Sequence, residues 1–184
     1  WGNNIDAALE RVNILKDAKV TWLEEPFYSD AYYEYSELAK KSDLPLAGGE
    51  SCHSVESAQN MIRYGKVKFI QIDAGIAGGI LAGKEICIFA ENNNVQYVNH
   101  TFTSHLQLSS SLQSYAGSSK SNFAEYPMQL KSLAWDITKN HININQDGEI
   151  NFPDDIGHGM VINEDSLKQY KVDVEININN KRIF

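Results

Sequence analysis

The sequence predicts an α/β fold in which parallel strands alternate with helices, and three observations support this prediction. Short apolar runs, typical of buried strands, are separated by segments in which apolar residues recur at helical spacing. Five of these runs end in an acidic residue or a histidine, at positions 24, 50, 73, 100 and 125. The distances between these positions are 26, 23, 27 and 25 residues, and each is about the length of one strand–helix unit.

Each element is predicted from its own apolar pattern. The first helix, residues 5–18, places Ile5, Leu9, Val12 and Leu15 on one face. The other expected helices cover residues 33–41, 55–63, 80–91 and 106–115. The expected strands cover residues 20–23, 44–47, 68–72, 95–98 and 122–126. After Pro127 the alternation stops, and we expect a hairpin with an Asp-Gly turn within 142–152 and a short helix at 164–170.

Two architectures fit this order of elements: a doubly wound sheet and part of a (β/α)₈ barrel, or TIM barrel. No Gly-x-Gly-x-x-Gly sequence follows the first strand, which argues against a dinucleotide-binding sheet. A complete barrel takes about 250 residues, so five strand–helix units would be its later portion. Residues 1–130 are therefore expected to form a partial barrel, strands 4 to 8, with the first strands before Trp1. Residues 131–184 are expected to pack across it.

Net charge, cysteine content and hydropathy indicate which partners and which cellular compartment to expect. A formal net charge of −8 argues against nucleic acid and against an anionic membrane surface. Cys52 and Cys87 show no paired spacing, which fits a reducing compartment. No signal peptide pattern and no apolar run of about 18 residues is found. These observations predict a cytoplasmic protein.

The five strand-end residues are the candidates for chemistry. In parallel α/β folds the carboxyl ends of the strands face the active site. A single polar residue at such a position is often there only because the following loop is solvated. Five in series, all acidic or histidine, indicate a shared site. They are Glu24, Glu50, Asp73, His100 and Glu125.

Glu24 and Glu50 are candidate metal ligands. Pro26 ends the first strand sharply, and two glycines directly before Glu50 permit close backbone approach. Carboxylate oxygens from separate strands suit Mg²⁺, whereas no Cys/His spacing indicates zinc. The alternatives are an N-cap role for Glu50 and a surface ion pair for Glu25.

Asp73 and His100 are candidates for an acid–base pair. Residues that end consecutive barrel strands can touch, so Asp73 could hold one ring nitrogen of His100 and raise the basicity of the other. A lone histidine is more often structural, but an Asp on the neighbouring strand strengthens the case. Gly75, Gly78 and Gly79 either approach a ligand closely or form the turn into the next helix.

Taken together, these segments resemble the C-terminal domain of the mandelate racemase/muconate lactonizing enzyme family of the enolase superfamily, mandelate racemase subgroup. The matching segments are Trp-Leu-Glu-Glu-Pro (22–26), Gly-Gly-Glu (48–50), Gln-Ile-Asp-Ala-Gly-Ile-Ala-Gly-Gly-Ile (71–80), Asn-His-Thr-Phe (99–102) and Glu-Tyr-Pro (125–127). Residues 152–160 are similar to the family's closing Pro-Asp-x-Pro-Gly-x-Gly segment, with Ile156 in place of the second proline. The resemblance covers essentially the whole chain.

The resemblance implies a role for each strand-end residue. Glu24 and Glu50 would be two of three Mg²⁺ ligands. Asp73 and His100 would form the dyad that removes the proton α to the substrate carboxylate. Glu125 would hydrogen-bond the carboxylate or the enolate oxygen, so that an enediolate intermediate is stabilised electrostatically.

The implied activity is that of a lyase: dehydration of an acid sugar, a small carboxylate, by a metal-binding homo-oligomer. An isomerase, either a racemase or an epimerase of a 2-hydroxy acid, is the alternative. Dehydration is preferred because it needs only one well-placed base. His53 and Ser104 are further candidates for substrate contacts. His53 could equally lie on the surface, and Ser104, like His105, could simply begin the next helix.

The sequence also departs from the family pattern. The family's first metal ligand, an Asp in an Asp-x-Asn motif, would fall just before Trp1, which is not a start methionine. The Lys-x-Lys motif and the N-terminal cap domain, on which residues 131–184 would also pack, are absent from the printed sequence. A second hypothesis is therefore an inactive, N-terminally truncated remnant that needs another chain to supply the missing groups.

Overall fold

The computed structural model describes residues 4–153, 155–179 and 181–183, so Trp1 lies outside the described residues. Its centre is a parallel sheet with the order β1-β2-β3-β4. The strands are β1 (Leu23–Glu24), β2 (Leu46–Gly48), β3 (Phe69–Ile72) and β4 (Gln96–Asn99). Strands that follow one another in sequence are therefore neighbours in space, and the predicted α/β fold with parallel strands is confirmed.

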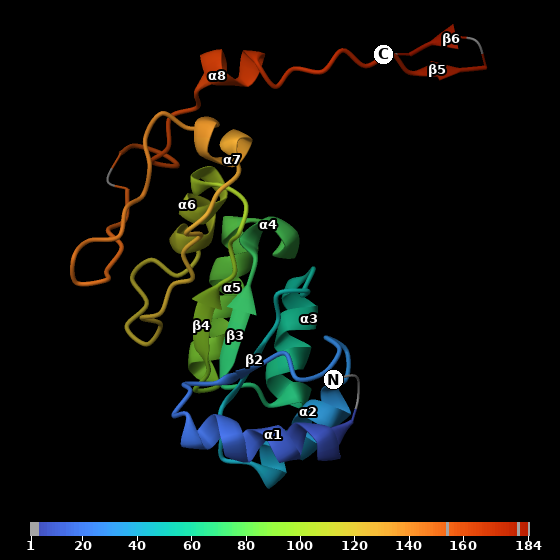
Figure 1. Ribbon diagram of the computed structural model, residues 1–184, viewed down its shortest axis with the longest axis vertical. Helices are drawn as coiled ribbons and strands as arrows, with labels where there is room; N and C mark the ends of the chain where they lie inside the picture. Colours follow the sequence, from blue (N-terminus) through green and yellow to red (C-terminus); the bar gives the residue numbers. More distant parts are fainter. Residues whose placement is uncertain (1–3, 154, 180, 184) are drawn as a thin grey trace.

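The predicted helices are all present, with small differences at their ends (Figure 1). They are α1 (Ile5–Asp17), α2 (Tyr32–Lys41), α3 (Val55–Asn60), α5 (Ile80–Asn92) and α6 (His105–Gln113). Helix α3 stops earlier than expected because the chain continues as one π-helical turn, η1 (Met61–Gly65). A short helix that was not predicted, α4 (Ala74–Ala77), follows β3 because the Asp73 side chain caps it.

Strands β1 and β2 begin later than the sequence indicated. The ladder starts where the amide of Leu23 donates to the carbonyl of Pro45, at 2.8 Å. Pro45 has no amide hydrogen, so it cannot itself donate to a neighbouring strand. The ladder then runs through Leu23 opposite Leu46 and Glu24 opposite Ala47. The predicted strands 20–23 and 44–47 are therefore displaced towards their C-terminal ends.

The predicted strand at 122–126 is wrong as a backbone strand. No ladder joins these residues to β4 in the described structure; side chains make the connection instead. The Ser121 hydroxyl accepts the Tyr97 amide at 3.0 Å, and the Asn99 side chain bonds both backbone groups of Glu125. A β-like apolar pattern could not reveal that polar side chains would take the place of the ladder.

The segment after Pro127 packs against the strand–helix region. Ile142 is buried, and its amide donates to Nδ1 of His105 at 2.9 Å. The expected hairpin is confirmed by an antiparallel bridge between Ile144 and Ile150, and Gly148 supplies a positive φ in its turn. The segment also contains α7 (Ser132–Asp136), which was not predicted, and the expected α8 (Glu164–Lys168).

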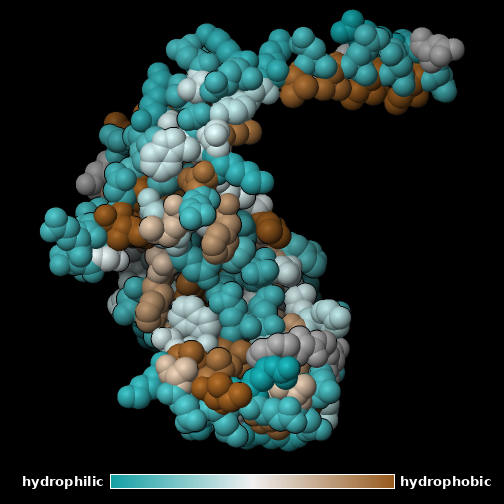
Figure 2. Space-filling model, viewed as in Figure 1, coloured by the Kyte–Doolittle hydropathy of each residue, from teal (hydrophilic) through white to brown (hydrophobic). Residues whose placement is uncertain are grey.

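The last residues form an extended arm that projects from the body of the molecule (Figure 1). It ends in the antiparallel pair β5 (Asn177–Ile178) and β6 (Lys181–Arg182). Every second residue of the arm is apolar and exposed, namely Val172, Val174, Ile176 and Ile178. Figure 2 shows a row of apolar atoms along one side of the arm.

No helix in the described part of the chain is long and apolar enough to cross a bilayer.

Candidate functional site

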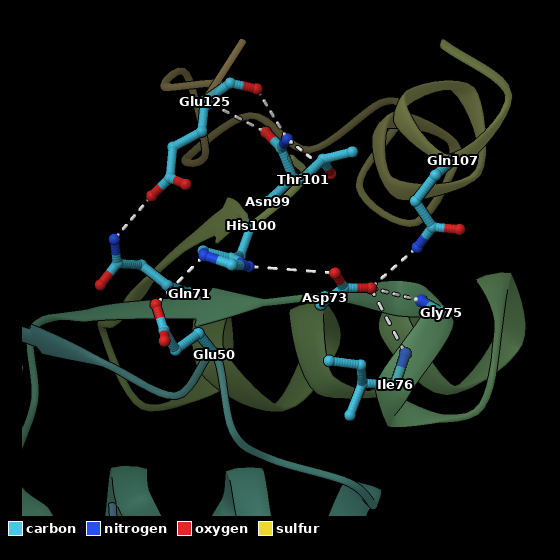
Figure 3. A network of polar contacts seen from close by, with 10 residues as sticks. All are labelled: Glu50, Gln71, Asp73, Gly75, Ile76, Asn99, His100, Thr101, Gln107 and Glu125. Carbon is cyan, nitrogen blue, oxygen red and sulfur yellow. Dashed lines mark hydrogen bonds and ion pairs between the residues drawn. The ribbon is translucent and has the colours of Figure 1, made fainter. Parts of the chain in front are cut away.

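His100 lies between two carboxylates at the carboxyl end of the sheet (Figure 3). Its Nε2 is 3.1 Å from Oε2 of Glu50, and its Nδ1 is 3.9 Å from Oδ2 of Asp73. The first distance is that of a hydrogen bond, whereas 3.9 Å is too long for one. His100 Nδ1 is buried and has no hydrogen-bond partner in the structure. The predicted proximity of Asp73 and His100 is thus observed, with Glu50 as a second neighbour.

Strand register is what brings Asp73 and His100 together. Ile72 of β3 pairs with Asn99 of β4, so the next residue of each strand leaves the sheet at the same level. The amide of His100 still donates to the carbonyl of Ile72, at 2.9 Å. Parallel strands thereby present residues 27 apart in sequence to one site.

Three donors hold the other oxygen of Asp73. Its Oδ1 accepts from the amides of Gly75 and Ile76, at 2.8 and 3.3 Å, and from Nε2 of Gln107 at 2.8 Å. The two amides belong to the first turn of α4, where a carboxylate is favourable. Oδ2 of Asp73 therefore remains on the side of His100.

The two side chains shift each other's protonation. Burial alone would raise the pKa of Asp73, but interaction with His100 and the two backbone amides outweighs it and lowers the pKa. Asp73 in turn raises the pKa of His100 against the effect of burial, and the charges of Glu50 and Glu125 act in the same direction. The imidazole is therefore a stronger base than a free histidine.

Glu125 belongs to the same site as His100, and a side chain of β3 holds its carboxyl group (Figure 3). Nε2 of Gln71 donates to its Oε1 at 2.6 Å, whereas its Oε2 is buried without a hydrogen-bond partner. Burial raises the pKa of Glu125, although Gln71 and His100 oppose the shift. A carboxyl group with one free, buried oxygen can bond a polar group of a ligand.

Glu25 does not make the expected surface ion pair. It is half-buried with φ of 38°, and its Oε1 accepts the amide of Gly49 at 3.3 Å. Burial raises its pKa; the Gly49 amide opposes the shift, and the charges of Glu50 and Glu24 add to it. The N-cap interpretation of Glu50 is also wrong, because Ser54 caps α3.

The donor set fits Mg²⁺ in chemical type. Glu24 is exposed, and in the described part of the chain its carboxylate accepts one hydrogen bond, from Trp22 Nε1 to Oε2 at 3.1 Å. Glu50 is half-buried. Their charges act on Glu25 and Glu125, so carboxylates gather at this end of the sheet. Oxygen ligands from separate strands suit a hard cation. Residues 4–153, 155–179 and 181–183 nevertheless contain no group of three His, Cys, Asp or Glu side chains placed to hold a metal.

Within the described residues, His53 and Ser104 make no hydrogen bond to Asp73 or His100. His53 is exposed and lines a hollow of about 420 Å³ with Asp30 and Cys52. Ser104 is the N-cap of α6, where its hydroxyl accepts the amide of Gln107 at 3.2 Å. It also lines a pocket of about 480 Å³ with Phe102, whose ring centroid is 4.9 Å from that of His100. Their predicted substrate contacts stay predictions.

The glycines after Asp73 form the turn between α4 and α5. Gly78, with φ of 114°, ends α4, and Gly79, with φ of 91°, precedes α5. Gly75 has a different role, because a Cβ there would come within 2.4 Å of Nε2 of Gln107. The absence of a side chain at Gly75 thus leaves room for the bond between Gln107 and Asp73.

Sequence reasoning missed three residues of the site. Gln71 stands two residues before Asp73, so strand alternation alone could have placed it on the same face. Asn99 precedes His100 and is fully buried, which its polar side chain did not suggest. Gln107 comes from the next helix, and no sequence signal links it to Asp73.

The family model and a solved structure that match this chain agree on its family. Residues 1–166 match the family described as Enolase C-terminal domain-like. The crystal structure of a predicted mandelate racemase from Rhodobacter sphaeroides superposes with a TM-score of 0.93 at 40% identity, and the match covers 100% of this chain and 47% of that one.

Two sequence relatives have named activities. A 3,6-anhydro-alpha-L-galactonate cycloisomerase of Streptomyces coelicolor is 23% identical over 171 residues, which are 91% of this chain and 44% of the relative. A D-galactonate dehydratase of Verminephrobacter eiseniae is 28% identical over 124 residues, which are 61% of this chain and 32% of the relative. The chain therefore spans less than half the length of these relatives.

Proposed function

Because the chain belongs to the Enolase C-terminal domain-like family, we propose that it supplies the histidine side of an active site that removes the proton α to a carboxylate. The substrate class is an acid sugar, and the favoured outcome is dehydration. The single observation that carries the proposal is the placement of His100 between Asp73 and Glu50, with Glu125 beside them.

His100 acts as the general base through Nε2. The α proton passes to Nε2, and the electron pair of the broken C–H bond enters an enediolate. The β-hydroxyl then leaves as water after it takes up the proton held on Nε2 of His100, which restores the neutral base, and the enol of a 2-keto acid remains. Asp73 stabilises the protonated imidazole from the Nδ1 side, and Nε2 must first be freed from Glu50.

Glu125 binds the substrate carboxylate or the enediolate oxygen through Oε2. This oxygen is buried and unbonded, and burial raises the pKa of the carboxyl, so the protonated form, which can donate a hydrogen bond, is less costly here than in water. Gln71 holds the other oxygen and so keeps Oε2 directed away from itself. A donor placed where negative charge develops stabilises the transition state.

Glu24 and Glu50 would hold Mg²⁺, with the remaining positions filled by water or by oxygen ligands from residues outside this sequence. When bound, the ion supplies positive charge that compensates the carboxylate of the substrate. Glu24 is exposed, and Glu50 is only half-buried, so both can turn towards a cation.

The fold is the C-terminal portion of an enolase-type barrel. We propose that β1 to β4 stand in the places of barrel strands 4 to 7, with residues 122–126 in the place of strand 8. We further propose that residues 131–184 pack on this barrel and on a cap domain outside the printed sequence. The exposed apolar side of the arm, residues 172–178, supports a partner surface there.

The proposed role of His100 as the base is tested with His100→Asn in the full-length protein. Exchange of the α proton is followed by NMR in D₂O over a panel of acid sugars. We expect the variant to lose exchange by about 10² to 10⁴-fold, the usual contribution of a general base. Glu56→Gln, at an exposed position of α3, serves as the control and should keep wild-type exchange. Undiminished exchange in His100→Asn would remove His100 from the base role.

A second candidate is isomerisation, which the cycloisomerase relative favours because its match covers more of this chain. Racemisation belongs to the same class. Mass spectrometry of the product separates the two, since dehydration gives a product lighter by one water and isomerisation leaves the mass unchanged. The same assay on the printed chain alone tests whether it is an inactive remnant.

A further inference from the structure

We infer that Asn99 is a positioning residue for Glu125: its side-chain amide replaces a missing strand pairing and holds the Glu125 carboxyl opposite His100. The role in catalysis rests on the proposed function, in which Glu125 contacts the substrate. The pair of hydrogen bonds between the Asn99 side chain and the Glu125 backbone, called the clamp below, is itself a property of the fold.

The clamp consists of two hydrogen bonds that run in opposite directions. Nδ2 of Asn99 donates to the carbonyl oxygen of Glu125 at 2.9 Å, and the amide of Glu125 donates to Oδ1 of Asn99 at 3.1 Å. Two residues of an antiparallel ladder exchange the same pair of bonds. Because both backbone groups of Glu125 are bound to one side chain, their direction is set by Asn99.

The surroundings of Asn99 fix the orientation of its amide. The Tyr115 hydroxyl donates to Oδ1 at 3.0 Å, and Nδ2 also donates to Oγ1 of Thr101 at 3.2 Å. A flipped amide would direct its NH₂ group at the amide of Glu125 and leave the Glu125 carbonyl facing oxygen. Asn99 is fully buried, so water cannot replace these partners.

Because the Glu125 backbone is held in place, the position of its carboxyl group is set as well. With the Glu125 backbone set by Asn99, its side chain meets Gln71 from β3 and leaves Oε2 buried and unbonded in the same site as His100 (Figure 3). Residues 122–126 have no ladder to β4 in the described chain, so the clamp supplies the registration that a strand would give. A displacement of about 1 Å at a reacting group can cost about 10²-fold in rate.

The test uses Asn99→Leu in the full-length protein, because Leu has a similar volume but neither donates nor accepts. We expect amide hydrogen exchange at Glu125 to become at least about tenfold faster, and kcat for α-proton exchange to fall about 10- to 100-fold. KM should change by less than about threefold, because the misplaced group acts mainly in the transition state. A purely structural role would lower the amount of folded enzyme and leave the kcat of each folded molecule unchanged.

Two further variants keep the test decisive. Asn99→Asp retains the shape and the bond from the Glu125 amide but sets a carboxylate oxygen against the Glu125 carbonyl, so it serves if Asn99→Leu does not fold. Asn122→Asp puts the same charge on an exposed residue of the same segment and should leave both readouts unchanged.

The outcomes separate the two claims. In Asn99→Leu, which removes both bonds, unchanged protection of the Glu125 amide overturns the clamp. In Asn99→Asp, which loses only the bond to the Glu125 carbonyl, an unchanged ¹³C shift of that carbonyl overturns it. Faster amide exchange with unchanged kcat overturns the positioning role and leaves the proposed function standing. If the wild-type full-length protein exchanges no acid sugar, the proposed function and the catalytic role fail together, and amide exchange still decides the clamp.

Discussion

Nε2 of His100 lies 3.1 Å from Oε2 of Glu50, so the proposed general base and a proposed metal ligand touch each other. A cation bound to Glu50 would compete with His100 for the negative charge of this carboxylate. A cation at Glu50 and a substrate at His100 therefore both act on this contact. Metal binding at Glu50 should therefore change the surroundings of the His100 ring.

Mg²⁺ is expected to perturb the ring resonances of His100 when it is titrated into the protein and followed by NMR. The physical reason is that a cation at Glu50 withdraws the negative charge that faces Nε2. Glu50→Gln should abolish this response. Glu56→Gln, at an exposed position of α3, is the matched control and should retain it. An equal response in Glu50→Gln would exclude Glu50 as a ligand.

Gln107→Ala is expected to lower the free energy of unfolding by about 1.5–3 kcal/mol, the range for a hydrogen bond to a charged group. The variant removes the bond from Nε2 to Oδ1 of Asp73, whose side chain is only 10% exposed. Urea unfolding measures the change. Gln113→Ala, at a half-buried glutamine of the same helix, should cost less. Equal losses in the two variants would show that the bond to Asp73 adds no stability.

Gly75→Ala is expected to break the same bond by a different route. The new Cβ would come within 2.4 Å of Nε2 of Gln107, so the amide must leave Asp73. The better helix propensity of Ala, about 1 kcal/mol, offsets part of the loss. In the double variant with Gln107→Ala the two losses should not add, because the second change removes the group that clashes. Additive losses in urea unfolding would disprove this coupling.

His105 is expected to make the protein less stable in acid. Its Nδ1 accepts the amide of Ile142, and burial followed by the nearby His141 lowers its pKa below the ordinary value of 6.5. As pH falls below 6.5 the unfolded state takes up the proton first, so the free energy of unfolding decreases until the folded pKa is reached. His158, with a pKa lowered by burial, acts in the same direction.

A comparison of variants isolates this contribution. The raised pKa of His100 has the opposite effect on the free energy of unfolding. The stability that His100 adds below pH 6.5 is lost as the pH rises through its folded pKa. In urea unfolding from pH 8 to 5, the difference between wild type and His105→Gln should shrink as pH falls. The difference for Asn122→Gln, at an exposed residue that does not titrate, should stay constant. A constant difference for His105→Gln would contradict the prediction.

Much of the fold could be predicted because apolar periodicity is a local property of the chain. Val12 is buried on the face that its spacing indicated, and Leu9 is half-buried against the core. Strand ends were less accurate, because the first ladder bond of Leu23 depends on its partner Pro45. The error at residues 122–126 had the same origin, since an apolar segment beside a sheet need not join its ladder.

The sequence by itself determined where β2, β3 and β4 end, and with them the positions of Glu50, Asp73 and His100. Residue order and strand alternation are enough for this, because parallel strands bring their carboxyl ends to one edge. Only the tertiary structure decided how these side chains are held. Hydrogen bonds from Gln107 on α6 and Gln71 on β3 hold the carboxylates, and Asn99 on β4 holds the backbone of Glu125; each partner is 26 to 54 residues away in sequence. Such contacts depend on packing and register, which no local pattern in the sequence encodes.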